Sequence, residues 1–261
     1  MHNTPPFFTP FETQPDVSVL PLQFTLMLHN TPHALCILAA ANLQHYLLTQ
    51  QDWKHNFGLT PDEDGAIIGK MFGVLVAQTP AGEVGYLWGF SGKLAGTNQH
   101  SLFVPPVFDT LAEGGFLAPG MRELSRMSDK IKQLKAEQPE GFLTSVKQLQ
   151  SDRKVYSNAL QRKLFDHYVC VNQQGESKSI QAIFETASYK NPPAGAAECA
   201  TPKLLQYAFL NNLKPLAVTE FWWGQSPKSD YWKHGEYYPC CKEKCEPILA
   251  HMLNGMEYCY S

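Results

Sequence analysis

The cysteines of this chain are concentrated near its C-terminal end. Of seven cysteines in 261 residues, five crowd into the last 63 residues. The odd number, and an N-terminus without the basic-then-apolar pattern of a secretory signal, argue against a disulfide framework. Cysteines that gather in a reducing compartment often bind a metal. The C-terminal part is therefore expected to fold around a metal site, in a cytoplasmic protein.

Charge and hydropathy exclude several classes of protein. No apolar run approaches the roughly 18 residues of a membrane helix, so no membrane partner is expected. The net charge of -3 argues against binding nucleic acid by charge alone, and no DNA partner is predicted. Residues 1–120 hold three basic against nine acidic residues, and residues 121–190 hold twelve against eight. A polyanion would thus contact the middle segment, unless that segment is simply a solvated helix.

The first 120 residues are expected to form an N-terminal α/β unit. Residues 33–50 carry apolar side chains at spacings of three and four, which is typical of a helix. Residues 69–78 and 83–90 are strand-forming and flank a Thr-Pro-Ala-Gly turn, which predicts a β-hairpin.

Residues 121–165 return to helical spacing, with a break at residues 139–141, and predict an antiparallel helical hairpin. This segment carries the basic excess of the chain. If the chain binds RNA, the candidate contacts here are Arg153, Lys154, Arg162 and Lys163.

Residues 166–261 predict a third unit with the order strand, strand, helix, strand, helix, strand. The elements are expected at residues 167–172, 179–184, 201–212, 216–223, 245–253 and 256–260. The predicted fold class of the whole chain is α+β. It consists of the N-terminal α/β unit, the helical hairpin and a C-terminal three-layer α/β unit.

Three cysteines stand at the predicted helix starts of the third unit. Cys199 precedes the first helix, and Cys241 and Cys245 lie at the start of the second. The helix macrodipole lowers thiol pKa values at such positions, which favours thiolate ligands. Two adjacent helices would bring the three sulfurs together as a zinc site with one open position. His234 and His251 are further candidates for a fourth ligand.

This order of elements and ligands resembles the zinc-dependent nucleobase deaminase fold, in which a His or Cys opens one helix and Pro-Cys-x-x-Cys opens the next. The sequence departs from that pattern in two places. The spacing from Cys241 to Cys245 is Cys-x-x-x-Cys, and Thr201 stands where the family has its catalytic glutamate. Glu198 is the candidate substitute, although it lies about 4.5 Å away along the helix axis. A closed structural zinc site and plain packing of the cysteines remain alternatives.

The aromatic loop before Cys241 offers a candidate surface for stacking on bases. Tyr231 and Trp232 are the residues that would provide it.

Five longer sequence segments resemble the N-terminal region of a bacterial subgroup of RluA-type RNA pseudouridine synthases. They occur in that family's order and span the chain from about residue 20 onward. The segments are GKMFGVLVAQ (69–78), GYLWGFSGKLAG (85–96), FVPPVFD (103–109), PPAGAAECATPKLLQYAF (192–209) and FWWGQSPKSDYWKHGEYYPCCKEKCEPILAHML (221–253). The resemblance maps the family's cysteines onto Cys199, Cys241 and Cys245.

The resemblance implies a cytoplasmic accessory protein of RNA modification. The chain has no His-Arg-Leu-Asp segment, which carries the aspartate nucleophile of those synthases, so it is not expected to form pseudouridine itself. It would bind tRNA, rRNA or a synthase partner, and hold one zinc. The alternatives are a zinc-dependent deaminase acting on a cytidine-type base, and a structural module that binds another protein through the helical hairpin.

Overall fold

The computed structural model describes residues 4–27, 31–61, 63–187 and 191–260. Within these residues it has six α-helices, a mixed seven-stranded sheet and a two-stranded sheet, which confirms the predicted α+β class. None of the described helices is both long and apolar enough to cross a membrane. The chain forms two compact units, one of residues up to Val107 and from Val169 onward, the other of Phe108–Tyr168.

The larger unit is built on a sheet with the strand order β1-β4-β3-β7-β2-β9, with β8 paired to β7. β3 is antiparallel to β4 and β7, whereas β2 is parallel to β7 and β9. The strands span Thr9–Pro10 (β1), Phe24–Leu26 (β2), Lys70–Gln78 (β3), Val84–Phe90 (β4), Lys214–Trp223 (β7), Tyr237–Tyr238 (β8) and Tyr258–Tyr260 (β9). The division predicted at residues 120 and 166 thus separates segments that the structure joins, because their strands pair.

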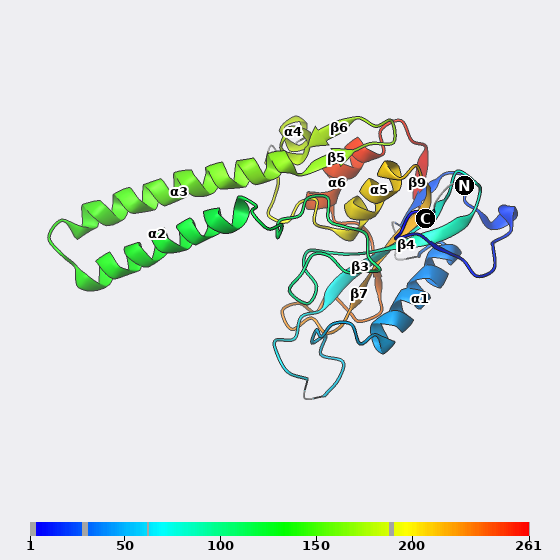
Figure 1. Cartoon of the computed structure of the whole chain (residues 1–261), viewed down its shortest axis with the longest axis horizontal. Helices are drawn as coiled ribbons and strands as arrows, with labels where there is room; N and C mark the ends of the chain where they lie inside the picture. The colour runs from blue at the N-terminus through cyan, green and yellow to red at the C-terminus, as the bar shows by residue number, and fades with distance from the viewer. Residues whose placement is uncertain (1–3, 28–30, 62, 188–190, 261) are drawn as a thin grey trace. The chain divides into compact units, whose positions relative to one another are not determined.

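Helices cover both faces of this sheet. Helix α1 (Ala34–Thr49), preceded by the short 3-10 helix Val17–Val19, packs in one core with Phe72 and Val74 of β3. Helix α5 (Ala200–Leu210) lies against Gly73. Because successive side chains of a strand point to opposite faces, α1 and α5 cover opposite sides. Helix α6 (Lys242–Met252) packs beside α5, as Figure 1 shows.

Of the six elements predicted within residues 166–261, the last four are present as α5, β7, α6 and β9. The antiparallel partner of β7 in the sheet is β3, which lies outside that segment. The hairpin predicted within residues 167–184 forms instead the separate sheet of β5 (Val169–Val171) and β6 (Ser177–Ser179). The strand predicted at residues 179–184 is wrong. Ser179 caps a helix there, α4 (Ile180–Thr186), whose side chains are buried at helical spacing.

The unit Phe108–Tyr168 contains the predicted helical hairpin, made of α2 (Leu117–Glu137) and α3 (Phe142–His167). The two helices pack closely, since a Cβ on Gly120 would lie 2.6 Å from Leu160 Cδ1. The chain reverses between Gln138 and Gly141, which both have positive φ, as the predicted break requires.

Candidate metal centre

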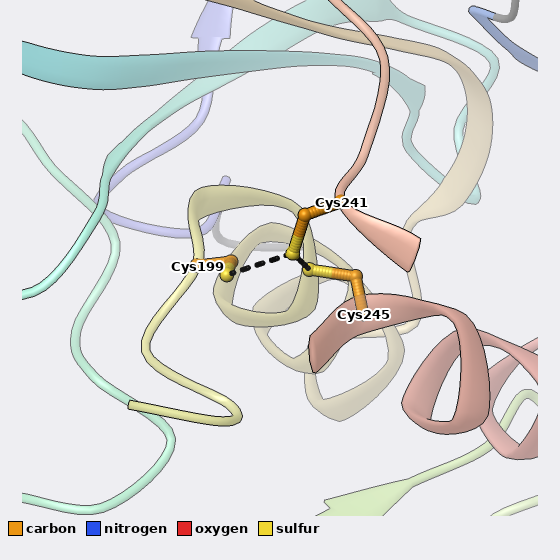
Figure 2. A group of neighbouring side chains, drawn as sticks. All are labelled: Cys199, Cys241 and Cys245. Atoms are coloured by element: carbon orange, nitrogen blue, oxygen red, sulfur yellow. Dashed lines mark hydrogen bonds between the residues drawn. The ribbon is translucent and has the colours of Figure 1, made fainter. Parts of the chain in front are cut away.

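Three cysteines converge where α5 and α6 begin. The sulfurs of Cys199, Cys241 and Cys245 all lie within 4.8 Å of one another. Cys241 Sγ is 3.3 Å from Cys245 Sγ and 3.9 Å from Cys199 Sγ (Figure 2). In the described residues this is the one group of three or more Cys, His, Asp or Glu side chains that could hold a metal ion. The three cysteines predicted as ligands therefore do lie together.

Backbone geometry places these sulfurs at two helix N-termini. Cys199 is the N-cap of α5 and Cys241 the N-cap of α6, and neither makes a side-chain capping bond. Cys245 follows one turn later, so its sulfur returns to the same face as that of Cys241. Both helices direct their positive ends at the cluster, which favours anionic sulfur. Cys241 is exposed, Cys199 half-buried and Cys245 buried, so the cluster lies at the surface with one side in the core.

The thiols differ in their acidity. Hydrogen bonds with Cys199 and Cys245 lower the pKa of Cys241 well below its usual range. The same contacts help to raise the pKa values of Cys199 and Cys245. Cys241 is therefore the thiol of the three that ionises most readily. A cation that binds here displaces the protons that the thiols still carry, which makes its affinity depend on pH.

A buried carboxylate lies beside the cluster and was missed by the sequence analysis. Glu220, in β7, is 5% exposed, and its Oε1 accepts 2.8 Å hydrogen bonds from the backbone N–H and the hydroxyl of Thr201. Burial raises its pKa to about 7, against the opposing effect of these bonds. The available signal was one acidic residue inside the stretch Leu216–Trp223, which is otherwise apolar except for Thr219.

Glu198, predicted as a catalytic carboxylate, lies just before Cys199 and outside the sulfur group. Its backbone carbonyl accepts a hydrogen bond from Gly92 N–H. Its charge acts on two lysines, Lys70 and Lys203, and favours their charged forms. Burial nevertheless lowers the pKa of Lys203 to about 8, and its Nζ donates to the carbonyl of Phe90 at 2.9 Å. The surroundings of Glu198 are thus cationic.

Neither histidine proposed as a fourth ligand belongs to the cluster. His234 Nδ1 accepts a hydrogen bond from Gly224 N–H, and its ring packs on Trp223. His251 Nε2 hydrogen-bonds with the carbonyl oxygen of Cys170. Both imidazoles therefore have structural partners away from the three sulfurs.

The four basic residues predicted to contact RNA all lie on α3, but two of them also hold the hairpin together. Arg153 Nε donates to Ser128 Oγ of α2 at 2.8 Å. Lys163 Nζ lies 4.5 Å from the ring centroid of Phe116. Lys154, Arg162 and Lys163 are exposed, so their side chains lie on the surface of α3, where a polyanion could contact them.

The two aromatic residues predicted to stack on bases belong to a packed aromatic group. Trp232 stacks on Trp222 of β7, with ring centroids 5.3 Å apart, and also contacts Tyr231 and Tyr238. Tyr231 is 61% exposed and Trp232 half-buried. The group therefore presents mainly the Tyr231 ring to solvent.

The raised pKa of Glu220 predicts how stability depends on pH in the metal-free protein. Between about pH 4.5 and 7 the folded chain retains a proton that unfolded Glu220 releases. This contribution to stability is complete below pH 4.5 and is lost as the pH rises through about 7, on the order of 3 kcal/mol. Urea unfolding of the reduced, metal-free protein at several pH values should show the loss. Glu220→Gln should flatten it, and equal slopes in the two proteins would contradict the assignment.

Comparisons of the chain with known proteins assign it to no family. No family model, curated protein or solved structure matches the chain. The two resemblances drawn from the sequence stay predictions, and the candidate metal centre rests on its own geometry.

Proposed function

We propose that this chain is a cytoplasmic zinc-binding accessory protein of RNA modification, which binds tRNA, rRNA or a synthase partner. The observation that carries the proposal is the convergence of Cys199, Cys241 and Cys245 at two helix N-termini. Cys199 and Cys241 are separated by 42 positions in the sequence. The fold therefore builds the cluster from two distant segments.

The donor set fits zinc. Thiolate sulfur is a soft ligand that suits Zn²⁺, Cu⁺ or an iron–sulfur cluster, whereas Mg²⁺ and Ca²⁺ prefer oxygen ligands. A tetrahedral zinc with bonds of about 2.3 Å has sulfurs about 3.8 Å apart. The distance from Cys199 Sγ to Cys241 Sγ, 3.9 Å, is close to that value, and the distance from Cys241 Sγ to Cys245 Sγ, 3.3 Å, would widen by about 0.5 Å on zinc binding. Three protein ligands would leave a fourth position for water, substrate or a partner's side chain.

Elemental analysis of reduced, purified protein tests the zinc proposal. We expect about one zinc per chain, and its loss in Cys199→Ser because two thiolates hold zinc far less tightly than three. Cys259→Ser is the matched control, since Cys259 is an exposed cysteine on β9 outside the sulfur group. A zinc-free wild type, or equal zinc in Cys199→Ser and wild type, would contradict the proposal.

The RNA part of the proposal is supported by the sequence resemblance and by the exposed cations of α3. Lys154 and Arg162 both face solvent on this helix. A second support is the exposed ring of Tyr231 in the loop that leads to Cys241.

Binding to tRNA should weaken as salt rises, because each neutralised phosphate releases counterions. Replacing Lys154 and Arg162 by Gln should weaken binding and lower the salt slope by about one for each lost phosphate contact. The control, with the same loss of charge, replaces the exposed Lys130 and Lys135 of α2. If the affinity for tRNA changes neither with salt nor on replacement of Lys154 and Arg162 or of Lys130 and Lys135, RNA recognition by α3 is contradicted. If a synthase copurifies with this chain and the chain alone does not bind RNA, the protein-binding alternative is favoured.

A zinc-dependent deaminase is the second candidate, favoured by the fourth position that three protein ligands leave open. Zinc would supply an activated water there. In this candidate Glu198 moves protons, although its surroundings are cationic.

For the deaminase candidate, zinc-loaded protein should convert cytidine to uridine in RNA, measured by nucleoside analysis. Glu198→Gln should abolish this turnover and retain zinc, because the amide cannot take up a proton. Absent turnover in zinc-replete wild type, or turnover unchanged by Glu198→Gln, would contradict the candidate.

A further inference from the structure

The N-cap side chain of α5 does not cap this helix. An N-cap side chain normally accepts a hydrogen bond from the N–H of the second or third helical residue. Cys199 is the N-cap and makes no such bond. The second helical residue is Thr201, and its N–H still needs an acceptor because it lies in the buried first turn.

Glu220 provides that acceptor from the neighbouring strand. Its Oε1 accepts the Thr201 N–H at 2.8 Å and the Thr201 hydroxyl at 2.8 Å. A carboxylate at a helix N-terminus also interacts favourably with the helix dipole. The cap of α5 therefore comes from β7, and the Cys199 sulfur has no capping role.

A glycine opposite Glu220 makes this approach possible. Gly73 of β3 is the register partner of Glu220. A Cβ at Gly73 would lie 2.8 Å from Ala200 Cβ, in the first residue of α5. The first turn of α5 thus lies directly on the sheet where Glu220 emerges, and a larger residue at position 73 would push that turn away.

The same hydrogen-bond chain extends to the second helix start. Thr201 Oγ1 accepts a hydrogen bond from Cys240 Sγ at 3.3 Å. Cys240 directly precedes Cys241, the N-cap of α6. Glu220, Thr201 and Cys240 therefore connect β7 to the beginnings of both helices that carry the three sulfurs.

We infer that Glu220, acting through Thr201, is the positioning residue of the metal centre. It caps α5 in place of Cys199, which leaves the Cys199 sulfur available to the ion, and it fixes the distance between the two helix starts. This inference rests on the proposed zinc binding. Groups that orient ligands in this way typically change metal affinity 10- to 100-fold when removed.

Zinc affinity, measured by competition with a chromophoric chelator, tests the inference. Glu220→Leu should weaken zinc binding about 10- to 100-fold, and Thr201→Val about 10-fold. Glu220→Gln should stay close to wild type, because its amide oxygen accepts the same two hydrogen bonds. The control is Thr219→Val, which removes the next buried polar side chain of β7, bonded to Met27 Sδ.

Cobalt absorption separates positioning from general stability. The d–d and thiolate charge-transfer bands of the Co²⁺ protein should change in Glu220→Leu and Thr201→Val, because the Cys199 sulfur is displaced, and stay unchanged in Thr219→Val. If Glu220→Leu does not fold, Thr201→Val and Glu220→Gln carry the test.

Three results would overturn the inference. The first is wild-type affinity and spectrum in folded Thr201→Val and Glu220→Leu, and the second is a loss in Glu220→Gln equal to that in Glu220→Leu. In both cases zinc in the wild type and its loss in Cys199→Ser would leave the zinc proposal standing. The third, a wild type without zinc, would overturn both.

Discussion

Strand β3 pairs with β7 along its whole length, and the larger unit is assembled around this pair. It runs antiparallel from Lys70 opposite Trp223 to Gln78 opposite Lys214, and joins segments about 140 positions apart. One face of this pair forms the core with α1, and the other receives α5. This one register positions Glu220 and Gly73, and with them the first turn of α5 that carries one side of the candidate metal centre. A shift by one residue would turn Glu220 to the opposite face, away from α5.

Local sequence patterns were enough to predict most of the helices and strands. They also predicted that the sulfurs of Cys199, Cys241 and Cys245 lie together. The helix at residues 33–50 and the hairpin at 69–90 have strong periodicity or turn signals, and both are present. The pairing of this hairpin with β7 was not predictable in this way, because alternation within a strand does not identify its partner. The strand predicted at residues 179–184 failed since Ser179 acts as a helix cap, which outweighs the β-branched content. Glu220 was missed because its role depends on a contact with Thr201, 19 positions away.

The centre combines an exposed and a buried side, and this division organises its electrostatics. Cys241, which ionises most readily, is exposed, whereas Glu220 and Lys203 are buried. Each buried charge is held by hydrogen bonds to the backbone, Glu220 by Thr201 N–H and Lys203 by the carbonyl of Phe90. Such bonds offset part of the cost of removing a charge from water. The buried ionisable groups therefore lie on the core side of the cluster, and its most acidic thiol belongs to its exposed cysteine.

The position of β2 has a consequence for the order in which the chain can fold. β2 lies between β7 and β9 and is parallel to both, with Phe24 opposite Tyr258. During synthesis from the N-terminus, this segment has no sheet partner until nearly two hundred further residues have left the ribosome. Pairs so distant in sequence carry a large loop-closure entropy and form late. The hairpin of β3 and β4 and the helices α2 and α3 consist of local contacts, so they can form first, and the final closure of the sheet awaits the last strand.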